Sequence, residues 1–319
     1  MKNHQIIEEP DAEEIHYSIC CGIDVHKAFV IACLLREGQK KEIRRYDTYT
    51  SNFQELAQWL KEENCEKIAM ESTGIYWRPL YNILEENELD VILVNAAHMR
   101  NVPGRKTDIG DAQWIAKLLK QGLLKPSFIL PRRQRDIKDL QRYKKSLQEE
   151  RNREINRLQK QLETVNVKLS MQLSDITGKT ARWLLEELLN GTIPEKEELI
   201  EKLPTQRMKN NVEQIKKSLE SRMSQGQKVL IKQILKRIDT LKADIEEIER
   251  EIEAMMREED ELIKEIKEIP GIGENSARVI IAEIGTEMEK FPDKEQIVSW
   301  AGLCPGKNES GGKKNSKRQ

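Results

Sequence analysis

Residues 17–49, YSICCGIDVHKAFVIACLLREGQKKEIRRYDTY, contain three runs with the character of strands in close succession. The runs cover 17–24, 28–36 and 42–49; each has the length of a strand, and the first two are strongly apolar. Short segments with charged residues and a glycine separate the runs and favour turns. We therefore predict that this part of the chain forms three successive antiparallel strands.

Helices and strands alternate after these three strands. The short apolar run at 67–71 has the character of a strand, and Ser51 is a suitable N-cap for the helix that precedes it. The elements predicted in this region are helix 51–63, strand 67–71, helix 76–87, strand 90–95 and helix 108–121. The resulting βββαβαβα order is typical of a mixed sheet with helices packed on it, in which the first and fourth strands are neighbours.

Most of the remaining chain has the apolar spacing of helices. From Ile231 to Met255, apolar residues recur at alternating steps of three and four, and charged residues fill most other positions. The pattern breaks at Glu259 and then resumes. Together with a helical pattern at 136–170 and a shorter helical segment at 181–208, it predicts a coiled coil. This coiled coil is either an antiparallel hairpin within one chain or an oligomerisation stalk between chains.

A proline and a glycine end this helical pattern. The segment 269–273, IPGIG, places two glycines before a predicted helix at 275–283. Glycine permits a tight turn, and backbone N–H groups at a helix start bind phosphate, so Gly271 and Gly273 predict a helix-hairpin-helix-like contact with a DNA backbone. The alternative is a simple glycine-rich connection between two helices.

The charges of the chain are strongly segregated. The 319 residues include 54 Lys or Arg and 55 Asp or Glu, for a net charge of −1. Residues 100–160 have 17 basic and 7 acidic side chains, whereas residues 242–268 have 5 and 12. The basic segment predicts a surface that faces a nucleic acid, and the alternative is that both segments are solvated helix faces. The nucleic-acid contacts assigned to the basic segment are Lys106, Arg132, Arg133 and Arg135.

Composition excludes several classes of protein. The longest apolar runs are too short to cross a bilayer, and the acidic N-terminus lacks the pattern of a signal peptide, which predicts no membrane partner. Five cysteines without regular spacing fit a reduced compartment and no zinc site. We expect a cytoplasmic, nucleoid-associated protein in which residues 1–16 form a disordered acidic leader.

Four acidic residues are predicted to meet at one edge of the sheet. Asp24 ends the first strand and Glu71 ends the fourth, and Asp108 and Asp111 lie three apart at the start of helix 108–121, on one helix face. Clustered carboxylates repel one another unless cations neutralise them, and oxygen ligands favour Mg²⁺ or Mn²⁺, which act on phosphodiesters. Taken singly, each acid is more often a helix cap, a first-turn acid or a strand-end surface residue.

The motifs that contain these acids resemble a known family. GIDVHK at 22–27, MESTG at 70–74 and KTDIGDA at 106–112 are similar to the motifs of DEDD transposases. These are recombinases of the insertion-sequence group "one hundred and ten", relatives of the Piv-type DNA invertases. The segments IPGIG at 269–273 and WAGLCPGKNESGGK at 300–313 resemble the second domain of that family, so the resemblance covers nearly the whole chain.

The resemblance implies an α/β and mostly-α architecture. It implies an RNase H/RuvC-like domain at 17–130, a coiled-coil arm at 131–268, and a small helical transposase domain at 269–319. It also implies that Asp24, Glu71, Asp108 and Asp111 form a catalytic Mg²⁺ site, and that Ser310 attacks the scissile phosphate to form a phosphoserine link. Lys313 and Lys314, beside this serine, are expected to contact the nucleic acid and offset charge at the phosphate.

The function implied is that of a DNA recombinase, or transposase, of an insertion sequence. Its expected partners are the element ends and target DNA, a structured non-coding bridge RNA, and further copies of the chain in a dimer or tetramer. One alternative is a metal-dependent nuclease of the Holliday-junction resolvase type, with Ser310 a spectator. Because the chain stops at Gln319, earlier than the family pattern, the other alternative is a truncated remnant that binds nucleic acid without catalysis.

Overall fold

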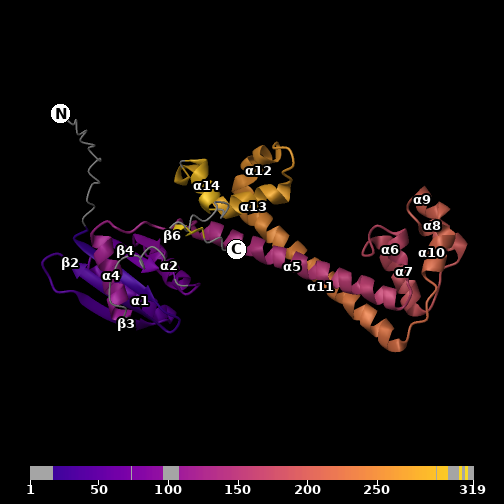
Figure 1. Cartoon of the computed structure of the whole chain (residues 1–319), viewed down its shortest axis with the longest axis horizontal. Helices are drawn as coiled ribbons and strands as arrows, with labels where there is room; N and C mark the ends of the chain where they lie inside the picture. The colour runs from indigo at the N-terminus through magenta and orange to yellow at the C-terminus, as the bar shows by residue number, and fades with distance from the viewer. Residues whose placement is uncertain are drawn as a thin grey trace. The chain divides into compact units, whose positions relative to one another are not determined.

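The computed structural model of the chain describes residues 17–72, 74–95, 108–291, 293–300, 309–310 and 313–314. The chain divides into two compact units, Met1–Arg132 with Glu289–Gln319, and Arg133–Met288. Figure 1 shows the sheet of the first unit and the long helices of the second. The predicted leader at 1–16 lies outside the described residues.

A five-stranded mixed sheet with the strand order β3-β2-β1-β4-β5 forms the centre of the first unit. β1, β2 and β3 are antiparallel in succession, whereas β4 is parallel to β1 and β5 is parallel to β4. The prediction that the first and fourth strands are neighbours is therefore confirmed. The strands are β1 Ile19–Val25, β2 Phe29–Arg36, β3 Glu42–Asp47, β4 Lys67–Glu71 and β5 Val91–Val94.

Helices cover both faces of this sheet. Side chains of α1 (Thr50–Glu62) and α2 (Trp77–Glu86) pack with one face, and those of α4 (Asp108–Lys120) pack with the other. Nearly every residue of β1 and β2 is buried as a result, which explains why these strands are continuous apolar runs rather than alternating ones.

The predicted N-cap of the first helix is wrong by two residues. α1 begins at Thr50, and its N-cap is Tyr49, which makes no side-chain capping bond. The Tyr49 carbonyl already accepts the Phe53 N–H at 3.0 Å, and Phe53 is buried in the core. Burial of the apolar helix face therefore sets this start, and Ser51 lies inside the first turn rather than capping it.

Two long helices, α5 (Arg132–Thr164) and α11 (Gln225–Met255), lie side by side and antiparallel (Figure 1). Lys144 on α5 contacts Glu249 on α11, and Glu150 on α5 contacts Arg237 on α11. The later residue on α5 thus pairs with the earlier residue on α11, as in antiparallel helices. The predicted pairing of long helices thus occurs within the chain, whereas coiled-coil interlocking of their side chains stays a prediction. No helix in the described part of the chain is long and apolar enough to cross a membrane.

Five shorter helices pack where α5 ends and α11 begins. Their apolar side chains share one buried cluster with Leu158, Leu162, Ile231 and Ile234 of the long helices. The helical segment predicted at 181–208 is divided here, because Gly191 ends the first helix in a left-handed conformation with φ 90°. The short helices are α6 Leu169–Gln172, α7 Lys179–Asn190, α8 Lys196–Lys202, α9 Gln206–Asn210 and α10 Val212–Ser218.

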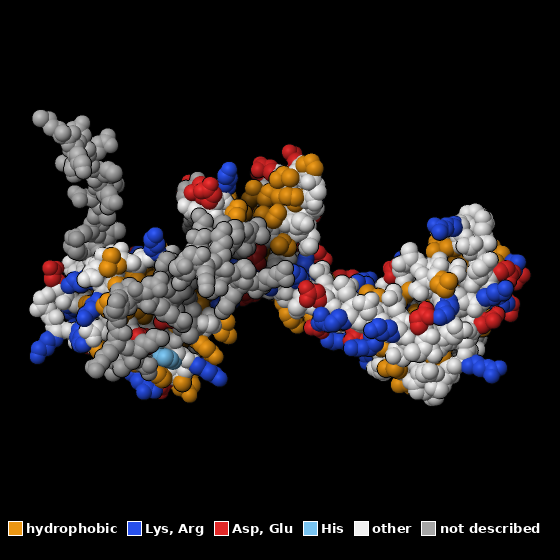
Figure 2. Space-filling view, viewed as in Figure 1, with side chains coloured by type: hydrophobic (Ala, Val, Ile, Leu, Met, Phe, Trp, Pro, Cys, Tyr) orange, Lys and Arg blue, Asp and Glu red, His pale blue; other side chains and the backbone are white. Residues whose placement is uncertain are grey.

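The predicted interruption at Glu259 is confirmed as a 3₁₀ turn, η1 (Arg257–Glu259), which leads into α12 (Asp260–Lys267) and α13 (Glu274–Ile284). Figure 2 shows hydrophobic side chains gathered over the α12–α13 pair, and Ile269 is 52% exposed. The remaining described elements are η2 Met288–Lys290, α14 Lys294–Trp300, and the two-residue strands β6 Glu309–Ser310 and β7 Lys313–Lys314.

Candidate functional site

Asp24 and Glu71 occupy equivalent places on neighbouring parallel strands. Ile23 of β1 pairs with Met70 of β4, and Asp24 and Glu71 are the next residues of these strands. Because side chains alternate between the faces of a sheet, both carboxylates project from the face opposite to the buried Ile23 and Met70. The predicted meeting of these two strand ends at one edge of the sheet is thus present in the fold.

The helix α4 crosses this same face in close contact with β1. The Cys20 thiol donates to the Ala116 carbonyl at 3.7 Å, whereas a Cβ on Gly22 would lie 2.4 Å from the Ala112 carbonyl oxygen. Residues later in β1 therefore contact residues earlier in α4, which means that the helix runs antiparallel to the strand. Its first turn, with Asp108 and Asp111, consequently lies toward the end of β1 that carries Asp24.

Asp24 is the most deeply enclosed of the three candidate ligands whose side chains the structure describes. It is 4% exposed, and its Oδ2 lies 2.8 Å from Nε2 of the half-exposed His26. Glu71 and Asp111 are both half-buried, and the side chain of Asp108 lies outside the described residues. The contact between His26 and Asp24 is not predictable from the GIDVHK motif, because residue spacing does not show which way a side chain in a turn points.

The donor set consists of carboxylate oxygens, which suits a hard divalent cation such as Mg²⁺ or Mn²⁺. Among described residues, no group of three or more His, Cys, Asp or Glu side chains is arranged to hold a metal ion. The predicted roles of Asp24, Glu71 and Asp111 as metal ligands therefore stay predictions. The fourth predicted ligand, Asp108, begins α4, and its side chain lies outside that set.

Burial makes the cysteines near the sheet poor candidates for chemistry. Cys20, Cys21, Cys33 and Cys65 are all buried and free of disulfides. Burial raises the pKa of the Cys20 thiol to about 11 and that of Cys65 to about 12. These thiols consequently stay protonated near neutral pH and act as small apolar side chains.

Ser310 lies in a short backbone ladder. It belongs to β6 and pairs with Lys313 of β7, and the Glu309 position pairs with Lys314. The side chains of these four residues lie outside the described set. The predicted roles of Ser310 as nucleophile and of the two lysines as phosphate contacts therefore remain predictions.

The arginines predicted to face nucleic acid have partners within the chain. Arg132 forms an ion pair with Glu86, and Nη2 of Arg133 donates to Glu259 Oε2 at 2.9 Å and also to the Met255 carbonyl. Arg135 is only 6% exposed. Arg133 and Arg135 thus have surroundings suited to internal contacts, and we leave both out of the proposed nucleic-acid surface. Lys106 lies outside the described residues.

Gly271 and Gly273 lie in the turn between α12 and α13. Gly271 has φ 91°, which favours glycine, and both residues are exposed with open space where a Cβ would be. Within the same unit, α13 is bound to α5 near both of its ends. The buried Lys144 donates to Asn275 at 2.7 Å, and Lys138 and Arg142 contact Glu283. The glycine turn is thus presented on a helix that polar contacts fix in place.

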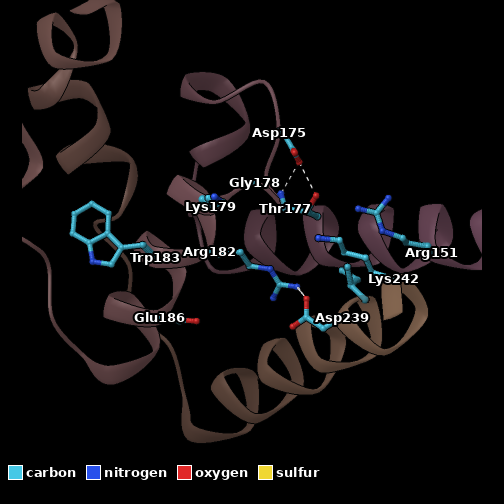
Figure 3. A pocket seen from close by; sticks show the side chains of 11 residues that line it. Arg151, Asp175, Thr177, Gly178, Lys179, Arg182, Trp183, Glu186, Asp239 and Lys242 are labelled. Carbon is cyan, nitrogen blue, oxygen red and sulfur yellow. Dashed lines mark hydrogen bonds and ion pairs between the residues drawn. The ribbon is translucent and has the colours of Figure 1, made fainter. Parts of the chain in front are cut away.

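A pocket of about 540 Å³ lies in the second unit, at the start of α7 (Figure 3). Two of its acids have partners in the lining: Asp239 pairs with Arg182, and Asp175 accepts hydrogen bonds from the Thr177 hydroxyl and amide, which lower the pKa of the Asp175 carboxyl. The sequence does not reveal this pocket, because its walls come from segments far apart in the chain. Its mixture of acids and bases selects no ligand class.

Comparison with known proteins identifies the family. Residues 21–167 match a model of the DEDD transposases of the IS110 group, described as "Transposase", and residues 263–319 match the model "Transposase IS116/IS110/IS902 family". No curated protein matches the chain. Among solved structures, Thermus thermophilus RuvC matches with a TM-score of 0.26 and 12% identity, over 34% of this chain and 99% of that one. The two family matches lie in the order of the motifs described above, and the chain belongs to the IS110 family of DEDD transposases, enzymes that recombine DNA.

Proposed function

We propose that this transposase cuts and rejoins DNA strands at the carboxyl edge of β1 and β4, with Asp24, Glu71, Asp108 and Asp111 as ligands of Mg²⁺ or Mn²⁺. The observation that carries the proposal is the register of the sheet: Asp24 and Glu71 follow the paired residues Ile23 and Met70. The antiparallel crossing of α4 over Gly22 adds the first turn of that helix to the same edge.

Each of these residues has a definite task in the proposed site. Asp24 and Glu71 supply oxygen donors from the rigid sheet, and His26 orients the Asp24 carboxylate through the 2.8 Å contact at Oδ2. Asp108 and Asp111 supply donors from one helix face. When bound, a divalent cation supplies charge stabilisation to a phosphodiester whose bond is being broken.

We further propose Ser310 as the nucleophile, with Lys313 and Lys314 next to the phosphate that it attacks. The family membership of residues 263–319 supports this assignment. A serine alkoxide attack would form a phosphoserine bond and release a DNA hydroxyl, and attack by a hydroxyl of the exchanged strand would reverse the step. The bond energy of the phosphodiester is thereby kept, and no hydrolysis is needed.

The remaining parts of the chain have proposed roles in binding. The exposed turn at Gly271 and Gly273 would contact a DNA backbone as a helix-hairpin-helix does, and Arg132 and Lys106 would contribute to the basic surface. A structured bridge RNA would select the target, and the coiled-coil arm would join copies of the chain in a dimer or tetramer. We propose a cytoplasmic, nucleoid-associated location, and we keep the division at 17–130, 131–268 and 269–319 for these roles.

A strand-exchange assay tests this function. The full chain is incubated with DNA carrying the element ends, a target DNA, the RNA transcribed from the flanking sequence, and Mg²⁺. Joined donor–target products that require both Mg²⁺ and the RNA are expected. Cleaved DNA with free ends and no joined product would instead favour a metal-dependent nuclease, and binding without cleavage would favour a non-catalytic remnant.

A further inference from the structure

A row of side chains crosses the sheet from Asp24 to its exposed edge. Asp24 of β1 pairs with Ile31 of β2, and Ile31 pairs with Arg45 of β3, which is the edge strand. Residues paired in this way lie on the same face of a sheet, so Arg45 shares a face with Asp24. Two strand spacings separate them, which is about 10 Å.

Aromatic rings connect the two ends of this row. The Arg45 guanidinium lies 4.1 Å from the centroid of the Phe29 ring, and the Phe29 and His26 ring centroids are 4.7 Å apart. His26 in turn contacts Asp24 at 2.8 Å. Arg45, Phe29 and His26, which we name the edge shelf, thus form a continuous series of contacts that leads to the candidate carboxylates.

The backbone under the edge shelf is fixed. The His26 N–H donates to the Phe29 carbonyl at 3.0 Å, which closes the turn between β1 and β2. The Thr48 hydroxyl, at the end of β3, donates to the Lys27 carbonyl at 3.0 Å and ties that turn to the edge strand. The backbone that carries His26, Phe29 and Arg45 is therefore held in place by contacts within the protein.

The neighbouring Arg44 differs from Arg45 in its face and in its charge balance. Arg44 pairs with Ala32, whose side chain belongs to the core on the opposite face, and its guanidinium lies 4.2 Å from the centroid of the Trp59 ring. Arg44 also forms an ion pair with Glu42 at 2.7 Å. Arg45 is exposed, and the structure shows no ion pair between it and a described carboxylate. Both arginines stack on an aromatic ring, but in the described part of the chain only the charge of Arg44 is balanced by a neighbouring carboxylate, so Arg45 is the better candidate to bind an anionic ligand.

We propose that the edge shelf binds the DNA strand that enters the carboxylate edge, with the Arg45 guanidinium on a backbone phosphate and Phe29 as the residue that positions it. A guanidinium matches phosphate geometry and stacks on aromatic faces at the same time. The distance of about 10 Å between Arg45 and Asp24 corresponds to about three nucleotides, at about 3.4 Å per nucleotide along a DNA strand. This inference rests on the proposed function, because that function places the cleaved strand next to Asp24.

Salt-dependent DNA binding tests the edge shelf without a metal. The full chain, in EDTA, is titrated into a fluorescein-labelled four-way DNA junction of mixed sequence over a range of KCl concentrations. Loss of one phosphate contact lowers the slope of log Kd against log salt concentration by about 1. Arg45→Ala is expected to show that loss and to bind more weakly at low salt, and Arg45→Lys is expected to recover the slope. Phe29→Leu is expected to weaken binding while the protein stays folded at the assay temperature, which a melting curve checks.

The matched control is Arg44→Ala, which removes an arginine from the same strand and is expected to keep the wild-type slope. An unchanged slope in a folded Arg45→Ala variant, or an equal loss in Arg44→Ala, would overturn the edge shelf. If strand exchange by the unaltered chain succeeds while Arg45→Ala binds normally, only this inference fails. If the unaltered chain neither binds the junction nor exchanges strands, the edge shelf and the proposed function fail together.

Discussion

A Cβ on Gly22 would lie 2.3 Å from the backbone nitrogen of Ala116. The sheet and α4 are thus in backbone contact at this point, two residues before Asp24 in the strand and five residues after Asp111 in the helix. We expect Gly22→Ala to force the helix away, to destabilise the protein by about 2–3 kcal/mol, and to abolish Mg²⁺-dependent DNA cleavage. Urea unfolding and a cleavage assay measure both effects.

The control for this substitution is Gly226→Ala. Gly226 lies in α11, and the nearest atom to its added Cβ is the Ser224 hydroxyl oxygen at 3.9 Å, which is an ordinary contact. Alanine also favours helix over glycine by about 1 kcal/mol, so this variant should be as stable as the wild type or more so. Normal cleavage by a folded Gly22→Ala variant would show that α4 does not set the carboxylate geometry.

Metal binding should depend on both strand-end acids. A bound ion stabilises the folded state by mass action, so Mn²⁺ should raise the Tm of the wild type, and Asp24→Asn and Glu71→Gln should each remove that shift. Asp90→Asn is the control, since Asp90 pairs with Lys67 and is 61% exposed. An undiminished Mn²⁺ shift in Asp24→Asn would place the metal elsewhere.

Much of this site is predictable from the sequence because it lies at the ends of strongly apolar runs. Glu71 is the last residue of β4 and Asp108 the first of α4, both as predicted. Contacts between residues far apart in the sequence are not predictable in this way. Arg133 forms an ion pair with Glu259, 126 residues away, and counting charges along the chain does not show which basic side chains are already paired. The start of α1 and the Arg45–Phe29 contact likewise depend on packing between segments that spacing alone does not bring together.

Lys144 should be essential for holding α13 on the long helices. It is 2% exposed and donates to Asn275 on α13, with Glu249 on α11 at 3.4 Å. Lys144→Ala leaves these polar groups without their cation, and we expect a loss of about 2 kcal/mol in urea unfolding. The adjacent exposed Lys145→Ala should change stability by no more than about 0.5 kcal/mol. Equal effects of the two variants would contradict this role.

The buried thiols predict a definite reactivity and pH dependence. Cys20, Cys21, Cys33 and Cys65 should react with Ellman's reagent only after denaturation, so a Cys304→Ala variant should show no fast-reacting thiol when folded. Burial raises the pKa of Cys20 from 9.0 to about 11, so its protonated form stabilises the fold fully below pH 9 and that contribution is lost as the pH rises to 11. Rapid labelling of two or more thiols in the folded variant would contradict their burial.

The most direct test of the account is a search for protein covalently attached to DNA. Strand-exchange reactions with Mg²⁺ are quenched in detergent and separated with and without protease, for the wild type, Asp24→Asn, Ser310→Ala and the control Ser316→Ala. We predict a protease-sensitive adduct that requires Mg²⁺, persists in Ser316→Ala, and is lost in both Asp24→Asn and Ser310→Ala. An adduct that survives in Ser310→Ala, or joined products that form without any adduct, would contradict the joint action of the carboxylate edge and this serine.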